Sequence, residues 1–357
     1  MPSDKRVFRM HVFPADHGDC LWVEHGTEEN IRNVLVDAGT DRGGKRLIKY
    51  IKNKHGGKVH FDMFAVTHID ADHVAGALPL LQAKGIDVTF GDVWFNGYVH
   101  LKPDTFDPMG GVQGEKLTTL LLRKKLSWNG AFTGKAIRLT SAGKPQQARL
   151  KTGASITVLS SDEERLMRLE KNWKEECREA GLDPKRRRPR QIAPKGFERM
   201  GVVDVDALAE SEFEEDISPS NGSSIGIVFE FEKKRIVLLG DACPSVVLNG
   251  LGALQSEGKF KADVVKLAHH GSAGNTNKEL IQRVEAKSWV FSTSGAIFNH
   301  PDDEAVARII KYASEPRLFF NYRTDNNNYW ENKTLQKQKH YSTEYGDGVK
   351  PLTISLI

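Results

Sequence analysis

Cysteine is scarce in this chain of 357 residues, which has three, far apart and in no C-x-x-C pair: Cys20, Cys177 and Cys243. Such sparse cysteines argue against a disulfide scaffold and a thiolate zinc site, and they favour a reducing compartment. Long apolar runs are also missing, since no stretch approaches the roughly 18 apolar residues of a membrane span. The N-terminal MPSDKRVFRM has no apolar signal core. We therefore expect a soluble cytoplasmic protein with no membrane partner.

Signatures of several enzyme classes are absent as well. The chain has no Gly-rich phosphate loop, no Ser-His-Asp order, no Rossmann fingerprint and no internal repeat. What is present is an ordinary globular composition, with 39% hydrophobic and 27% charged residues. The length allows one large α/β domain or two smaller ones. The net charge of +4 permits a nucleic acid or another anionic substrate without requiring one.

The densest group of chemically active side chains lies in Thr67–Gly76, which reads THIDADHVAG and follows the apolar run Phe61–Val66. We predict a buried strand and then a tight loop that turns four side chains inward: His68, Asp70, Asp72 and His73. Imidazole and carboxylate ligands together suit zinc or a harder ion such as manganese. The alternative is a polar loop in which Asp70 or Asp72 caps the next helix. A cap needs one acid, however, and does not need the histidines.

Two later strands are also predicted to end in polar groups. The strand Arg235–Leu239 ends in Gly240-Asp241, and a carboxylate at a strand end could bridge two metals or simply form a turn. The strand Lys261–Ala268 leads into His269-His270-Gly271-Ser272. Adjacent strand residues point in opposite directions, and the loop can reset that, so which histidine faces a metal stays open.

These motifs occur in a characteristic order: Gly18-Asp19, Asp37-x-Gly39, H-x-D-x-D-H at 68–73, Asn221-Gly-Ser-Ser, Leu-Leu-Gly-Asp241, His269-His-Gly-Ser and Asn299-His300-Pro. The series resembles the metallo-β-lactamase superfamily, whose commoner metal loop is H-x-H-x-D-H. The version with aspartate in the third position resembles the metallo-β-lactamase-like domain of ComEC and its stand-alone soluble relatives. The resemblance implies an α/β fold, an αββα sandwich of two mixed β-sheets with helices outside. It covers one domain, residues 1–357, apart from an insertion at 160–218.

The resemblance also implies two divalent metal ions. His68 and Asp70 would hold one ion, and Asp72, His73 and one of His269 and His270 would hold the second. Asp241 would bridge the two. Zinc is the expected metal, and Asp70, a hard oxygen ligand, makes manganese the alternative.

Other residues near these motifs are expected to support the metals or the substrate. The catalytic candidates are Asp72, His269 and His300, where a histidine would donate a proton to the leaving group or bind a phosphate oxygen. In relatives, the residue matching Asp37 orients the metal loop. His17 and Asp19 are either supporting groups or part of a solvent-exposed turn with Gly18 at positive φ.

The insertion at 160–218 differs in composition from the rest. A polar helix is predicted from Asp162 to about Ala180, with an apolar side formed by Leu166, Leu169 and Trp173. The basic run Lys185–Arg190 and the acid-rich stretch Asp204–Asp216 follow it. The basic run either contacts nucleic-acid phosphates, is a solvated loop, or pairs with the acidic stretch.

The expected function is therefore a metal-dependent hydrolase, a dinuclear phosphodiesterase or nuclease with a metal-activated water. The first alternative is a hydrolase of a small phosphodiester or ester on the same metals. A non-catalytic scaffold is the second, and the complete ligand set argues against it. The fold does not choose between the substrates, because this superfamily hosts many of them.

Overall fold

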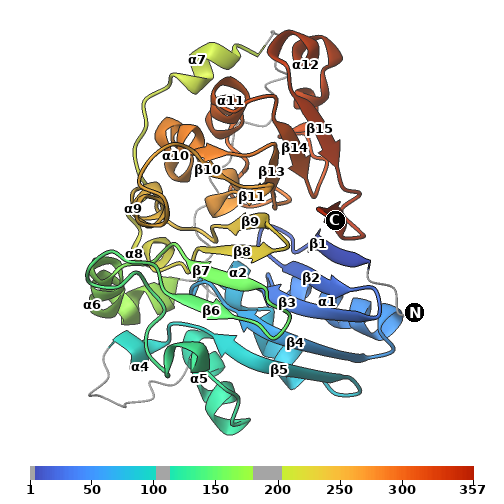
Figure 1. Ribbon diagram of the computed structural model, residues 1–357, viewed down its shortest axis with the longest axis vertical. Helices are drawn as coiled ribbons and strands as arrows, with labels where there is room; N and C mark the ends of the chain where they lie inside the picture. Colours follow the sequence, from blue (N-terminus) through green and yellow to red (C-terminus); the bar gives the residue numbers. More distant parts are fainter. Residues whose placement is uncertain (1–4, 102–112, 180–202) are drawn as a thin grey trace.

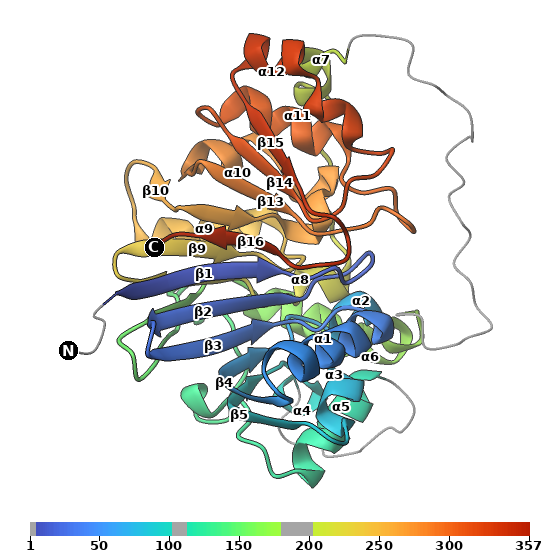
Figure 2. The same ribbon diagram turned by 90° about the vertical axis from the view of Figure 1, so that its right-hand side faces the viewer.

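The computed structural model describes residues 5–101, 113–179 and 203–357, and two large β-sheets form its centre (Figure 1). The first sheet has six strands in the order β16-β1-β2-β3-β4-β5. Their bounds are β1 Arg6–Val12, β2 Leu21–Thr27, β3 Asn30–Val36, β4 Lys58–Ala65, β5 Asp87–Trp94 and β16 Leu352–Ser355. β16 lies antiparallel beside β1, so the two ends of the described chain meet in this sheet (Figure 2).

The second sheet has eight strands in the order β15-β14-β13-β11-β9-β8-β7-β6. Their bounds are β6 Gln147–Arg149, β7 Ser155–Val158, β8 Ile227–Phe231, β9 Lys234–Leu238, β11 Val264–Lys266, β13 Ser288–Phe291, β14 Arg317–Phe320 and β15 Ser342–Tyr345. The strands β9, β11, β13, β14 and β15 are parallel, and β6 to β9 are antiparallel. Both sheets are therefore mixed, because β3, β4 and β5 are parallel in the first. The short strands β10 (Phe260–Lys261) and β12 (Val284–Glu285) form a separate pair.

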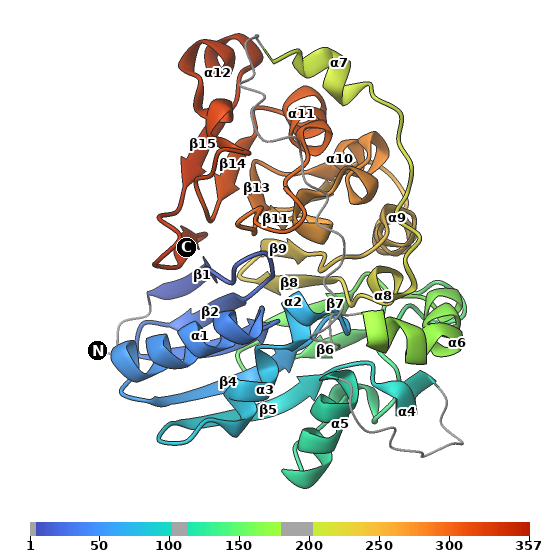
Figure 3. The ribbon, with the colours of Figure 1, turned by 180° about the vertical axis from the view of Figure 1, so that it is seen from behind.

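Helices cover the outer faces of both sheets (Figure 3). Those preceding residue 203 are α1 Asp41–Lys54, α2 Ala71–Val74, α3 Ala77–Gln82, α4 Tyr98–Leu101, α5 Gln113–Arg123 and α6 Glu163–Glu179. The later ones are α7 Val205–Ala209, α8 Pro219–Gly222, α9 Pro244–Leu254, α10 Lys278–Arg283, α11 Asp303–Tyr312 and α12 Lys333–Lys339. Short 3-10 turns are η1 Gly130–Phe132, η2 Ala268–Gly271, η3 Ala273–Asn275 and η4 Asn328–Glu331. Within the described ranges, no helix is long and apolar enough to cross a membrane.

Three apolar clusters hold the four layers together. Between the sheets, side chains such as Phe8 and Met63 of the first sheet join the same cluster as Phe229 and Val290 of the second. The outer face of the first sheet packs against α1, α3, α5 and α6. The outer face of the second packs against α9, α10, α11 and α12. The αββα sandwich predicted from the sequence is thus confirmed by the two sheets and their helices.

The helix α1 shows how the sequence specifies its layer. The hydroxyl of Thr40 caps the helix by accepting a hydrogen bond from the backbone N–H of Gly43 at 3.1 Å. Leu47 and Ile51, spaced by four residues, bury one face against the first sheet. The lysines of the last turn, Lys52 and Lys54, favour the negative end of the helix.

Two predicted elements differ from the structure. The predicted strand Lys261–Ala268 is divided into β10, which pairs with β12, and β11, which joins the second sheet. Apolar residues at helical spacing predict one helix over Val74–Lys84, but the structure begins it earlier, at Ala71, and interrupts it between α2 and α3. Gly76 at this interruption packs against the main chain, because a Cβ there would lie 2.0 Å from the carbonyl oxygen of Ala38.

The segment predicted as an insertion contributes to the packed structure. The apolar side of α6 is buried, and its Leu169 and Trp173 belong to the cluster outside the first sheet. In the acid-rich stretch, Asp206 pairs with Lys339 at 2.5 Å and Glu210 with Lys311 at 2.8 Å. The basic run Lys185–Arg190 lies outside the described residues.

His25 on β2 is expected to make the fold sensitive to acid. Its ring is fully buried, 5.1 Å from the ring of Phe229 and 5.6 Å from that of Phe231. Burial lowers the pKa of His25 to about 4, so the unfolded chain binds a proton between pH 6.5 and 4 that the folded chain does not. Stability is therefore lost as the pH falls through this range, by about 2–3 kcal/mol between pH 7.5 and 4.5.

Urea unfolding at these two pH values checks this expectation. His25→Phe should show a smaller loss of stability on acidification than the parent protein. His60→Phe, which changes an exposed histidine on β4, is the matched control and should retain the parental difference. An unchanged pH dependence in His25→Phe contradicts the expectation.

Candidate metal centre

The polar loops meet at one edge of the sandwich because parallel strands of each sheet end there. In the second sheet, β9, β11 and β13 are adjacent and parallel, and they lead into Asp241, His269-His270 and Ser292. In the first sheet, β3 and β4 are parallel and lead into Asp37 and the metal loop. The carboxyl ends of parallel strands share an edge, so these loops converge although they are far apart in sequence.

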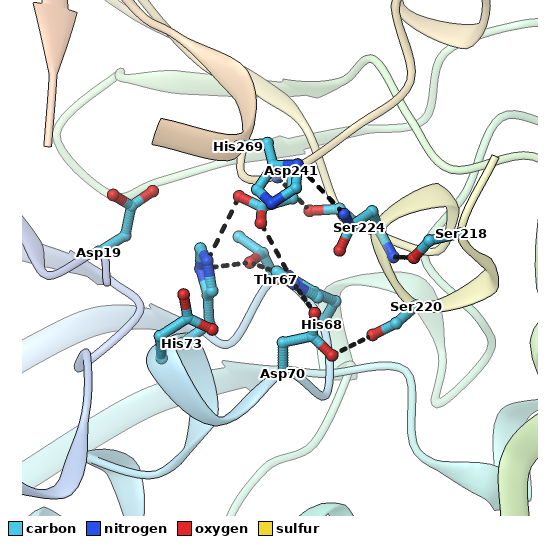
Figure 4. A network of polar contacts seen from close by, with 12 residues as sticks. Asp19, Thr67, His68, Asp70, His73, Ser218, Ser220, Ser224, Asp241 and His269 are labelled. Carbon is cyan, nitrogen blue, oxygen red and sulfur yellow. Dashed lines mark hydrogen bonds and ion pairs between the residues drawn. The ribbon is translucent and has the colours of Figure 1, made fainter. Parts of the chain in front are cut away.

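Asp241 lies between two sets of donor atoms (Figure 4). On one side, the Nε2 atom of His68 lies 3.7 Å from Asp241 Oδ2 and 3.6 Å from Asp70 Oδ2. On the other side, His73 Nε2 lies 3.3 Å from Asp241 Oδ1. The carboxylate is 2% exposed, so water reaches it very little. One buried carboxylate therefore faces both histidines of the metal loop.

The second donor set also includes Asp72 and His270. His270 Nε2 lies 3.2 Å from Asp72 Oδ2, 3.3 Å from His73 Nε2 and 3.9 Å from Asp241 Oδ2. Asp72, His73 and Asp241 thus each place a donor atom within 3.9 Å of His270 Nε2. The structure brings His270, and not its neighbour His269, into this set.

The buried carboxylate of Asp37 holds the metal loop in place through Thr67 and His73. One carboxylate oxygen accepts a hydrogen bond from the backbone N–H of Thr67 at 2.8 Å. The other accepts from the Thr67 hydroxyl and lies 2.8 Å from Nδ1 of His73. A carboxylate on Nδ1 sets the ring orientation and leaves Nε2 as the donor atom. Asp70 is held separately by the hydroxyl of Ser220, which donates to its Oδ1 at 2.6 Å.

The alternative role of Asp70 as a helix cap finds no support in this geometry. Asp70 occupies the N-cap position of α2, but its side chain makes no capping hydrogen bond. Its carboxylate instead lies between Ser220 and His68.

The turn before β2 is not the solvent-exposed turn that was the alternative for His17 and Asp19. Asp19 is fully buried, and its backbone N–H donates to the carbonyl oxygen of Asp72 at 3.2 Å. The positive φ, +63°, is at Asp16 and not at Gly18. Gly18 is needed for another reason, since a Cβ at this position would lie 1.8 Å from the Asp72 carbonyl oxygen. The turn therefore packs directly on the metal loop.

Asp19 and Lys266 form a buried ion pair behind His270. Both side chains have no exposed surface. Asp19 Oδ1 lies 3.4 Å from Nδ1 of His270, which is also 2.8 Å from the carbonyl oxygen of Ser292. Lys266 was not among the residues predicted for the site, although a lysine inside the predicted apolar strand Lys261–Ala268 was an available signal.

The His269 ring contacts residues outside the two donor sets, and both it and His270 have positive φ, +45° and +57°. Its Nδ1 lies 2.9 Å from Asn275 Oδ1 and 3.2 Å from Asp216 Oδ2. The neighbouring ring of His300 is 5.1 Å away, centre to centre, and its own Nδ1 lies 3.0 Å from Asp302 Oδ1. The two catalytic histidine candidates thus lie side by side at the rim of the site.

The carboxylates and imidazoles of the site shift one another's charge states. Burial alone would raise the pKa of Asp241, but His73 and His270 hold that pKa well below its ordinary value. Burial alone would lower the pKa of His73, but Asp241 and Asp37 raise it well above 6.5. The carboxylates therefore stabilise positive charge at the centre of the cluster.

The donor set fits divalent metal ions. His68 Nε2 and Asp241 Oδ1 are buried, and neither makes a hydrogen bond within the described part of the chain. Buried donor atoms without partners cost free energy unless another group satisfies them. Two triads lie close enough to hold a cation, and they are His68, His73 and Asp241, and Asp19, His73 and His270. Imidazole and carboxylate are ligands for zinc and manganese.

Several residues at the site were missed by the sequence analysis. Asp216 comes from the segment between α7 and α8, Ser220 from α8 itself, and Asn275 follows the His269-His270 turn. Asp302 occupies the N-cap position of α11. Each is an ordinary turn or cap residue in sequence. Only the folded chain places them beside the metal loop or its histidines.

Comparison with known proteins gives likenesses of fold. No protein-family model matches the chain, and no curated protein matches its sequence. A mutant of CmlA beta-hydroxylase is 10% identical to this chain, with a TM-score of 0.43. The match covers 100% of this chain and 55% of the CmlA chain. Zn(2+)-bound PqqB from Methylobacterium extorquens is 10% identical with a TM-score of 0.45, covering 97% of this chain and 100% of that one. The metallo-beta-lactamase fold protein YhfI from Bacillus subtilis is 12% identical, with a TM-score of 0.39, and the match covers 97% of this chain and 99% of that one.

Proposed function

We propose that this protein is a metal-dependent hydrolase with two divalent ions, and that it cleaves phosphodiesters. The observation that carries the proposal is the position of Asp241, a buried carboxylate within 3.9 Å of donor atoms on both sides. A carboxylate shared in this way keeps two metal positions close together. Two such ions, when bound, supply a nucleophile at neutral pH and stabilise the charge on the attacking and leaving oxygens.

The proposed ligands follow from the two donor sets. His68, Asp70 and Asp241 would hold one ion, and Asp72, His73, His270 and Asp241 would hold the other. Zinc is the proposed metal, with manganese as the alternative because three of these ligands are carboxylates. Asp70 is also the residue on which we place the protein in the ComEC-like branch, where the metal loop has aspartate at this position.

His269 and His300 are the proposed substrate-contacting groups. Nδ1 of His269 faces oxygens of Asn275 and Asp216, so the ring is held in place. When the ring is protonated, its Nε2–H would donate to a phosphate oxygen. Such a charge-assisted hydrogen bond suits an anionic phosphodiester better than a neutral ester. Nucleic acid is the proposed substrate, and contact with Lys185–Arg190 stays a prediction.

Metal analysis and a substrate panel test the proposal. Protein purified without chelator should contain close to two divalent ions per chain. It should hydrolyse bis(p-nitrophenyl) phosphate, lose this activity with a chelator, and regain it with zinc or manganese. Absence of metal, together with no uptake of either ion, contradicts the metal centre.

The same panel separates the substrate classes. Cleavage of single- or double-stranded DNA or RNA supports the nuclease proposal. Hydrolysis of the chromogenic phosphodiester without cleavage of any nucleic acid contradicts it in favour of a small phosphodiester. Hydrolysis of p-nitrophenyl acetate alone contradicts the phosphodiesterase proposal as a whole.

A further inference from the structure

A row of aromatic rings runs along the rim of the metal centre. The ring of Phe298 lies 6.1 Å from that of His17 and 6.0 Å from that of His300, with a 29° angle between the planes of the latter pair. His300 in turn lies 5.1 Å from His269. His17 directly precedes Gly18, which packs on the carbonyl oxygen of Asp72. Phe298 is therefore flanked on both sides by rings that adjoin the metal centre.

The turn that carries Phe298 is fixed in place. The N–H of Ser294 donates to the carbonyl oxygen of Asp16 at 2.7 Å, which ties the start of the turn to the Asp16–Asp19 loop. The N–H of Asn299 donates to the carbonyl oxygen of Gly295 at 3.1 Å and closes the turn. Both closing residues have positive φ, +66° at Gly295 and +62° at Asn299. A turn held at both ends positions its side chains repeatably.

Phe298 is not part of the apolar core. It is 39% exposed, and its neighbour Ile297 is 47% exposed, whereas His300 beside it is 9% exposed. Another exposed apolar side chain, Ile217 at 73%, directly precedes the Ser218–Asn221 segment that contacts Asp70 and His269. These exposed apolar side chains lie in loops that adjoin the site, and none of them belongs to the apolar clusters of the described residues.

We infer that Phe298 is a specificity-determining residue that stacks on the base of a nucleoside attached to the scissile phosphodiester. An aromatic face suits any planar heteroaromatic ring, and base–aromatic stacking is a general device of proteins that bind unpaired nucleotides. The phosphate would lie at the metals and His269, with the attached base against Phe298 on the solvent side. This inference rests on the proposed phosphodiesterase function and names the chemical group recognised beside the phosphate.

The experiment compares two kinds of ester that release the same leaving group. Thymidine 5′-p-nitrophenyl phosphate and its 3′ isomer carry a base, and methyl p-nitrophenyl phosphate does not. The nitrophenyl ring is common to all three, so the ratio of kcat/KM for the better thymidine ester to that for the methyl ester reports on the nucleoside, and its change in Phe298→Ala reports on the ring that Phe298 contacts. We expect a parental ratio well above one, and a fall of about tenfold in Phe298→Ala. Phe298→Tyr, which keeps the ring, should retain the parental ratio.

The control is Leu122→Ala on α5, which removes an apolar side chain of similar exposure, 47%, from a helix outside the first sheet. Its ratio should equal the parental one. A ratio that stays unchanged in Phe298→Ala overturns the inference and leaves the phosphodiesterase proposal standing. The kcat/KM of Phe298→Ala for the methyl ester, expected to stay near the parental value, shows that this variant is folded, and the ratio is read on that basis. A parental protein that hydrolyses none of the three esters, with zinc or with manganese, contradicts the proposed function itself.

Discussion

Asp241→Asn is expected to lower phosphodiester hydrolysis by more than about 100-fold and to remove at least one metal ion per chain. The amide has the shape of the carboxylate but lacks its negative charge. In the parent protein this charge faces His68 on one side and His73 on the other, at 3.7 and 3.3 Å. If Asp241 is the ligand shared by both ions, the loss of its one negative charge weakens the binding of both.

Asp263→Asn is the matched control for this variant. Asp263 precedes β11 at the opposite end from His269, where its carboxylate pairs with Lys234 at 2.8 Å. We expect it to retain both ions and the parental rate. The measurements are elemental analysis and initial rates with bis(p-nitrophenyl) phosphate. If Asp241→Asn kept two ions and full activity, Asp241 would not be the shared ligand.

The position of a site residue could be predicted where the local sequence alone decides it. A polar group directly after a buried strand is expected at the sheet edge, and His68 and Asp241 do lie close together there, 3.7 Å apart. Their grouping into one metal centre came from the family resemblance. Asp37 was assigned to the metal loop only through the family resemblance, and it does hold Thr67 and His73. The αββα layers followed from the same resemblance, and the sheets confirm them.

The choice between His269 and His270 could not be predicted, because it depends on two successive residues at positive φ. Strand alternation would point one ring to each face. The left-handed turn instead directs His270 to the donor sets and His269 to Asp216. Local sequence carries no reliable signal for such a turn when neither residue is glycine.

Elements without an apolar pattern were missed for a different reason. The edge strands β6 and β15 read QAR and STEY, and they alternate between exposed and half-buried side chains. Their pairing comes from a neighbouring strand and not from their own composition. The supporting residues Asp216 and Asn275 depend likewise on long-range packing, so no spacing rule connects them to the histidine that they hold.

Lys266→Met is expected to destabilise the fold by about 3–5 kcal/mol, because it leaves the Asp19 carboxylate buried without its partner. Methionine has a similar length and fits an apolar strand, so the loss is mainly electrostatic. The ion pair links the two sheets, because Asp19 precedes β2 of the first sheet and Lys266 is the last residue of β11 in the second. Burial would raise the pKa of Asp19, but the charge of Lys266 lowers it to about 2. Urea unfolding of the metal-free protein at pH 7.5 measures the effect.

The double variant Asp19→Asn/Lys266→Met separates the lost charge pair from lost packing. Asparagine removes the unpaired charge with little change of shape, so the double variant should be more stable than Lys266→Met alone by about 1–3 kcal/mol. Lys261→Met, which alters an exposed lysine on β10, should stay within about 0.5 kcal/mol of the parent protein. Equal stabilities for the single and double variants would show that Asp19 does not need Lys266. The metal content of the double variant then reports on Asp19 itself, since its Oδ1 lies 3.4 Å from Nδ1 of His270 and would orient that ring.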